Sequence, residues 1–171
     1  MDERCVDERC VDERDIDERD IEKEKCMSWD IREALDEGEV RSCWPVFREL
    51  RLNIPSEELF VDRWRNQRAE GYRIVLLERE GEVQAVAGFR ILHSMAWGRI
   101  LYLDDLGALS DQHGGGLGTA LLRHVQQLAR DAGCEAVHLD TGHQRHRAHR
   151  AYLRNGFVFD SHHLQWRVTD A

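Results

Sequence analysis

Four glycines lie within five residues at positions 114–118, between residues 99–109, which are predicted to form a strand, and residues 116–132, which are predicted to form a helix. A glycine-rich turn in this position leaves backbone N–H groups unpaired at the start of the helix, where they can bind a phosphate group. No Lys-Ser or Lys-Thr follows, so the turn is not the phosphate loop of nucleotide hydrolases. Taken alone, the turn is equally compatible with a flexible loop.

The rest of the chain predicts a mixed α/β (α+β) fold, with about four helices around a largely antiparallel mixed sheet. The predicted strands cover residues 29–34, 72–79, 83–92, 99–109 and 135–141, with one or two closing strands in 157–168. The predicted helices cover residues 37–52, 56–71, 116–132 and 144–155. Ser56 is expected to cap its helix, and residues 80–82 to form the turn of a hairpin.

Residues 2–21 repeat with a period of five and carry much of the charge of the chain. Residues 1–26 contain twelve Asp and Glu against six Lys and Arg, which is −6 of the total net charge of −9. A step of five turns about 140° on a helix, so the repeat forms no apolar face. We expect residues 1–26 to be a disordered or marginally helical tail, or an acidic interaction arm, before one domain at 27–171. A further hypothesis is that translation naturally starts at Met27.

Composition excludes several classes of protein. No run approaches the roughly 20 apolar residues of a membrane span, and the charged N-terminus does not resemble a signal peptide, so we expect a cytoplasmic protein without a membrane partner. The acidic balance argues against nucleic acid as a partner. The five cysteines lack C-x-x-C spacing, which favours reduced thiols over a disulfide framework or a zinc ribbon.

Three segments together resemble the GNAT superfamily of N-acetyltransferases over roughly residues 28–168. They are L-Y-L-D-D-L at 101–106, H-G-G-G-L-G-T-A-L-L at 113–122 and A-H-R-A-Y-L-R-N-G-F at 148–157. The resemblance implies the GNAT fold and acetyl-CoA as cosubstrate. It also implies a cofactor site made of Leu106, Gly107, Ala108, His113, Gly114, Gly115, Gly116, Leu117, Gly118, Thr119 and Arg145. His113 stands where the family usually has Arg or Gln, and Arg145 where many members have Asn.

The resemblance also implies the catalytic residues. Tyr152 falls on the family's tyrosine and is expected to protonate the departing CoA sulfur. Strand alternation puts Asp104 with Leu106 and Ala108 on one face and Asp105 on the other, so only one aspartate should face the cleft. The family pattern favours Asp104 as a base acting through water, although a bulge would exchange the two aspartates.

Six histidines crowd residues 138–163, but neighbouring arginines and the lack of a ligand motif argue against a metal. The function expected is acetylation of a small cationic primary amine by direct attack on the thioester. Two alternatives remain open: a protein lysine or N-terminal acetyltransferase, and a catalytically degenerate acyl-CoA-binding module. The sequence leaves the acceptor undetermined and is compatible with a homodimer.

Overall fold

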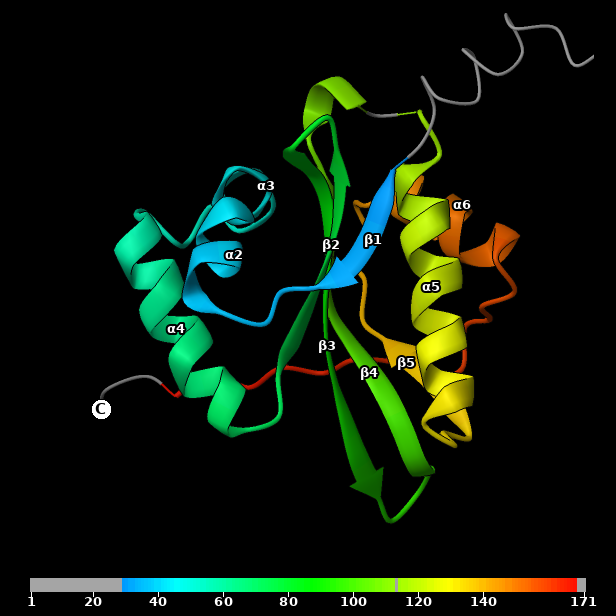
Figure 1. Cartoon of the computed structure of the whole chain (residues 1–171). Helices are drawn as coiled ribbons and strands as arrows, with labels where there is room; N and C mark the ends of the chain where they lie inside the picture. The colour runs from blue at the N-terminus through cyan, green and yellow to red at the C-terminus, as the bar shows by residue number, and fades with distance from the viewer. Residues whose placement is uncertain (1–28, 113, 169–171) are drawn as a thin grey trace, which may run out of the picture.

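A computed structural model describes residues 29–112 and 114–168 of the 171-residue chain. It contains one five-stranded sheet in the order β1-β2-β3-β4-β5 (Figure 1). Neighbouring strands are antiparallel except β4 and β5, which are parallel. The strands are β1 (Asp30–Glu33), β2 (Arg73–Arg79), β3 (Glu82–Ser94), β4 (Gly98–Ala108) and β5 (Ala136–Leu139). The predicted mostly antiparallel mixed sheet is therefore confirmed.

Helices cover both faces of this sheet. They are α2 (Glu37–Ser42), α3 (Trp44–Leu50), α4 (Glu57–Ala69), α5 (Leu117–Asp131) and α6 (His146–Arg154), with a 3₁₀ turn η1 (Ser110–Gln112). Helices α2 to α4 lie on one side of the sheet and α5 and α6 on the other (Figure 1). Within residues 29–112 and 114–168, no helix has the length and apolar character needed to cross a bilayer.

Alternating side chains of β2 build the two halves of the core. Ile74 and Leu76 pack with α2, α3 and α4, while Val75 and Leu77 pack with α5 on the opposite face. All four side chains are at most 1% exposed. Because both faces of the central strands are covered, β2 appears in the sequence as a nearly continuous apolar run.

The helix predicted over residues 37–52 is divided into α2 and α3, with Cys43 between them. Pro45, near the start of α3, has no N–H to donate to a carbonyl one turn earlier, so the first helix ends before it. Ser56 caps α4 as predicted, with its hydroxyl accepting a hydrogen bond from the N–H of Leu59.

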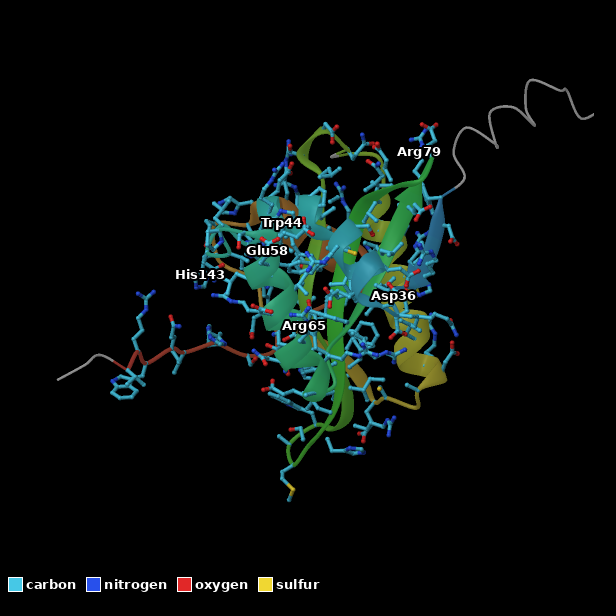
Figure 2. The ribbon with its side chains drawn as sticks, turned by 60° about the vertical axis from the view of Figure 1, so that its left-hand side comes forward. Asp36, Trp44, Glu58, Arg65, Arg79 and His143 are labelled. Carbon is cyan, nitrogen blue, oxygen red and sulfur yellow. The ribbon has the colours of Figure 1, made fainter. Side chains whose placement is uncertain are left out.

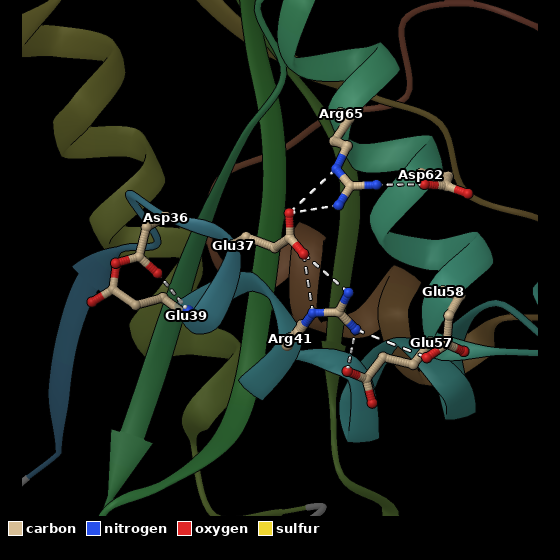
Figure 3. Close-up of polar contacts among 8 residues, drawn as sticks. All are labelled: Asp36, Glu37, Glu39, Arg41, Glu57, Glu58, Asp62 and Arg65. Atoms are coloured by element: carbon tan, nitrogen blue, oxygen red, sulfur yellow. Dashed lines mark hydrogen bonds and ion pairs between the residues drawn. The ribbon is translucent and has the colours of Figure 1, made fainter.

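Two arginines connect α2 to α4 on the outer surface (Figure 3). Arg41 contacts Glu37 of its own helix at 3.0 Å and Glu57 of α4 at 2.8 Å. Arg65 of α4 reaches back to the same Glu37 at 2.7 Å. Isolated surface pairs stabilise proteins little, but a shared network fixes the relative position of the two helices.

The closing strands predicted in residues 157–168 are absent from the part of the chain that the structure describes, where this segment has no regular structure. Alternating apolar residues indicate which side of a strand is buried, but a strand also needs a hydrogen-bonding neighbour. This segment forms no ladder with β5 within the described residues. The predictions made for residues 1–28 and for His113 lie outside the described residues.

Candidate active site

Strand β4 loses its neighbour halfway along. Its pairing with β5 covers Ile100 to Leu103, whereas its pairing with β3 continues to Ala108. Residues 104–108 therefore have one backbone edge that no described strand occupies. Leu106, Gly107 and Ala108, predicted to contact the cofactor, lie on this stretch. Backbone N–H groups on a free edge can pair with an extended ligand as a further strand would.

A bulge in β4 puts both aspartates on the same side of the sheet. Gly88 of β3 pairs with Asp105 and the next residue of β3 pairs with Leu103, so Asp104 is the extra residue. Leu106 and Ala108 pack on the α5 side, while both aspartates line one cavity on the α3 and α4 side. The prediction that only one aspartate can face the cleft is therefore wrong, because the bulge interrupts the alternation.

Asp105 is a hydrogen-bond acceptor for two side chains of the fold. Only 8% exposed, its carboxylate accepts a hydrogen bond from Arg51 Nε at 2.5 Å and another from the Tyr72 hydroxyl at 2.6 Å. The Tyr72 hydroxyl lies directly over Gly88, where an added Cβ would stand 1.9 Å from it. Burial, followed by the Asp105 charge, raises the pKa of Tyr72 well above its usual value, so this phenol stays protonated.

Asp104 is more accessible and has one arginine partner for its side chain. Arg90 Nε of β3 lies 3.0 Å from its carboxylate, and both side chains are about one-fifth exposed. Burial raises the pKa of Asp104 above its ordinary value, and Arg90 opposes that shift. A carboxylate with a raised pKa that remains accessible is suited to accept a proton.

The cavity beside these aspartates has a volume of about 400 Å³. Aromatic and amide side chains from α3, α4 and Tyr72 form much of its wall, and two arginines, Arg51 and Arg63, line it together with the two aspartates. Formal charges in the lining therefore cancel. Arg63 is exposed, and it makes no hydrogen bond or ion pair with the described residues. The cavity thus offers an unpaired cation as well as a basic carboxylate.

The glycine turn lies at the N-terminus of α5, at the same end of the molecule as the C-terminal end of β4 (Figure 1). Gly114 and Gly116 have φ of 96° and 82°, a backbone conformation that favours glycine. No described side chain caps α5. An added Cβ at Gly116 or Gly118 would meet nothing within 4 Å, so the backbone is open to a bulky anion.

The other residues of the predicted cofactor site divide by exposure. Gly115 and Arg145 are exposed and Thr119 is half-buried. The side chain of Leu117 is only 5% exposed and belongs to the core, so this residue can contribute only its backbone to the site. The turn lines neither the cavity beside Asp104 nor the cavity that contains Tyr152.

Tyr152 of α6 packs against the core on the α5 side, with its ring 5.7 Å from that of Phe157. Its hydroxyl makes no hydrogen bond with the described residues. Burial raises the pKa of Tyr152, while the charges of Arg145 and Arg51 oppose the shift. The phenol is therefore protonated at neutral pH.

Three residues of this site are not found by the sequence analysis: Arg51, Tyr72 and Arg90. Two residues of the strand over 82–94 could have indicated the site, because Gly88 and Arg90 interrupt a run of apolar residues. A glycine inside a strand often marks a bulge or a close approach. Among the described residues, no group of three or more His, Cys, Asp or Glu side chains is placed to hold a metal ion. Histidines pair locally instead, as His149 does with the carbonyl of Gly142 at 2.9 Å.

Comparison with known proteins agrees with this geometry. Residues 23–157 match the acetyltransferase (GNAT) family. The chain belongs to this family. It is an N-acetyltransferase, and the family transfers acetyl groups from acetyl-CoA to amines.

Individual relatives differ in what they acetylate. An uncharacterised N-acetyltransferase of Bacillus subtilis, YhdJ, is 27% identical over 77% of this chain and 94% of its own length. The aminoalkylphosphonate N-acetyltransferase of Salmonella typhimurium is 36% identical over 50% of this chain and 55% of its own length. Among solved structures, the aminoglycoside acetyltransferase AAC(6')-Iy with a bisubstrate analogue has a TM-score of 0.72. It shares 16% identity over 84% of this chain and 99% of its own, a likeness that shows the fold alone.

Proposed function

We propose that this GNAT enzyme uses acetyl-CoA to acetylate the primary amine of a small molecule, which approaches as an ammonium ion. One observation carries the proposal. The guanidinium of Arg51 bonds to the carbonyl of Asp104 at 2.7 Å and to the carboxylate of Asp105, and its charge also acts on the Tyr152 hydroxyl. We infer that Arg51 links the candidate base on β4 and the candidate acid on α6 into one reaction centre.

The cosubstrate fits the open backbone of the chain. Unpaired N–H groups within residues 114–119 would hold its phosphates, and Arg145 is the positive charge that the family resemblance assigns to this site. The free edge of residues 104–108 would pair with its extended arm, and donors there would hold the thioester carbonyl. When bound, acetyl-CoA supplies the acetyl group as an activated thioester.

The proton transfers are assigned to two side chains. Asp104 removes a proton from the ammonium, through water, so that the neutral nitrogen can form the new N–C bond. Tyr152 gives its phenolic proton to the sulfur as the C–S bond breaks, and the second proton that the nitrogen loses on amide formation returns through water to the phenolate. Each side chain begins in the required state at neutral pH, since Asp104 is ionised and Tyr152 is protonated.

The charges in the cavity indicate which class of acceptor it can bind. Because Asp105 and Asp104 already have arginine partners, a polyamine would meet little uncompensated negative charge. Arg63 instead suits an acceptor that carries an anionic group beside its amine, such as a carboxylate or a phosphonate. The likeness to an aminoalkylphosphonate N-acetyltransferase supports this class.

The experiment is to measure thiol release from acetyl-CoA with three acceptors of equal length: 2-aminoethylphosphonate, ethanolamine and ethylenediamine. We expect kcat/KM to be about tenfold higher for the phosphonate, in line with a charge-assisted hydrogen bond at an exposed site. Arg63→Ala should remove that preference, whereas Arg48→Ala, at an exposed arginine of α3 outside the cavity, should retain it. A preference for ethylenediamine contradicts the anionic group, and absence of turnover with every amine contradicts the small-molecule acceptor.

A further inference from the structure

The outer face of α6 carries a row of positive charges. Three exposed arginines lie three and four residues apart, which puts them on one face of the helix; they are Arg147, Arg150 and Arg154, here called the arginine row. Tyr152, which is half-buried, lies on the opposite face. Residues 143–154 contain four arginines and three histidines but no Asp or Glu. The helix therefore presents an uncompensated basic face to solvent.

The arginine row has no counter-charge in the described part of the chain. Its three side chains make no hydrogen bond or ion pair with the residues that the structure describes. The arginines of α2 and α4 differ, because Arg41 and Arg65 share Glu37 (Figure 3), and Arg65 and Glu58 of that network come forward on α4 in Figure 2. Like charges three or four residues apart destabilise a helix, and α6 buries no residue. An anionic partner on the row would therefore stabilise the helix that carries Tyr152.

The sequence contains a segment of opposite charge. Residues 1–26, here called the acidic segment, carry −6 of the net charge of −9. The triplet Asp-Glu-Arg recurs every five residues from Asp2 to Arg19, so negative charge is spread along the segment. Such a segment can match a row of arginines at several registers, because no single pair is essential to the contact.

The described chain begins on the side of the sheet that α6 covers. Trp29, its first residue, packs against the core cluster of α5, and Tyr152 of α6 joins the same cluster. Figure 1 shows the start of β1 beside the first turns of α5, with α6 next to them. A chain spans at most about 3.5 Å per residue and a nine-residue helix is about 14 Å long, so the acidic segment is long enough to reach the row.

We propose that the acidic segment binds the arginine row of α6 in the same chain. Carboxylates of the repeat accept charge-assisted hydrogen bonds from the guanidinium groups of the row. Attachment to the same chain keeps the local concentration of the segment high. The contact replaces repulsion along the row with attraction and leaves the inner face, with Tyr152, unobstructed. It does not depend on which amine the enzyme acetylates.

The first test attaches a nitroxide to Cys10 of the full chain and measures the broadening of amide signals by NMR. Cys5, Cys26 and Cys134 are replaced by serine, and Cys43 stays unlabelled because burial raises its pKa to about 12. At about 20 mM salt the signals of residues 146–154 should broaden, and at about 500 mM they should recover, since salt screens exposed charges. Broadening spread evenly over the surface overturns the proposal. So does broadening of an unlabelled chain mixed with labelled chains, because the segment would then bind a second copy.

The second test removes charge from the row. Arg147→Gln combined with Arg150→Gln should reduce the broadening of α6 at least about twofold, because two of the three guanidinium groups are lost. Arg48→Gln combined with Arg68→Gln is the matched control, which removes two exposed arginines of α3 and α4 and should leave the broadening intact. Unchanged amide signals of β2 and β3 show that each variant is folded. An equal loss in both pairs overturns the proposal, as does weaker acetyl-CoA binding with undiminished broadening, which would assign the row to the cosubstrate.

Discussion

The helices on the two sides of the sheet differ in how many of their residues they bury, when α2, α3 and α4 are compared with α6. Helices α2, α3 and α4 bury six residues, Val40, Val46, Phe47, Phe60, Val61 and Trp64, and arginines join α2 to α4 (Figure 3). Helix α6 buries none, and every residue of β5 is half-buried. The walls of the cavity beside Asp104 are therefore tightly packed by the fold, whereas α6, which carries Tyr152, is held more loosely.

The largest effect is expected from Asp105→Ala, as a loss of stability. Asp105 lies on the side of the sheet that α2, α3 and α4 cover, here called the acceptor side. Asp105→Ala removes the acceptor of both Arg51 and the buried Tyr72 hydroxyl, so the free energy of unfolding should fall by about 2–3 kcal/mol. The lower part of the range for buried pairs applies because Arg51 is 38% exposed. Urea denaturation measures the change. Asp111→Ala, at an exposed carboxylate, is the control, and an equal loss in both variants would show that Asp105 does not hold this side together.

On the opposite side of the sheet, at Tyr152 of α6, the expected effect is on the turnover rate. Tyr152→Phe keeps the ring that packs on Phe157 and removes a hydroxyl without a partner in the described chain, so stability should change by less than about 0.5 kcal/mol. Turnover should fall at least about tenfold while acetyl-CoA affinity stays nearly constant. Steady-state kinetics and calorimetry together separate the two quantities. An unchanged turnover rate excludes Tyr152 as the acid.

The acidic limb of the pH profile sharpens the comparison, because it depends on Asp104 and its surroundings alone. Arg90 lowers the pKa of Asp104 against the larger effect of burial, so Arg90→Gln should raise that pKa further. The carboxylate must be ionised to act as a base. Activity should therefore be lost at a higher pH, and the acidic limb of kcat/KM should move upward. Arg73→Gln, which removes an arginine paired with Glu33, should leave the limb in place.

Local patterns predict most of this fold, and long-range contacts account for what they miss. Period-two alternation and turn residues locate the hairpin of β2 and β3, whose turn has φ of 54° at Glu80 and 82° at Gly81. The same alternation gives the wrong faces for Asp104 and Asp105, because the bulge arises from pairing with β3. Alternation over 157–168 also predicts strands that need a partner, which the described part of the single chain does not provide.

Sequence analysis predicts which residues belong to the site better than it predicts the contacts between them. The order of the aspartate strand, glycine turn and tyrosine helix indicates the family and therefore Tyr152 and Asp104. Arg51 and Tyr72 approach Asp105 from 54 and 33 residues away in the sequence, and no local spacing reports such contacts. The roles of Tyr152 and Asp104 remain predictions that the variants above test.

An effect on stability of opposite sign to that of Asp105→Ala is expected at the glycine turn, at the start of α5. Gly118 is the second residue of α5 and has no neighbour within 4 Å of an added Cβ, so Gly118→Ala should stabilise the chain by up to about 1 kcal/mol. The same methyl group would stand where a phosphate approaches the backbone, and the dissociation constant for acetyl-CoA should rise about tenfold. Gly38→Ala is the matched control, at the second residue of α2, and should leave that constant unchanged. A more stable variant with weaker binding assigns Gly118 to the ligand rather than to the fold, whereas unchanged affinity places the phosphates elsewhere and leaves the acid and base proposals standing.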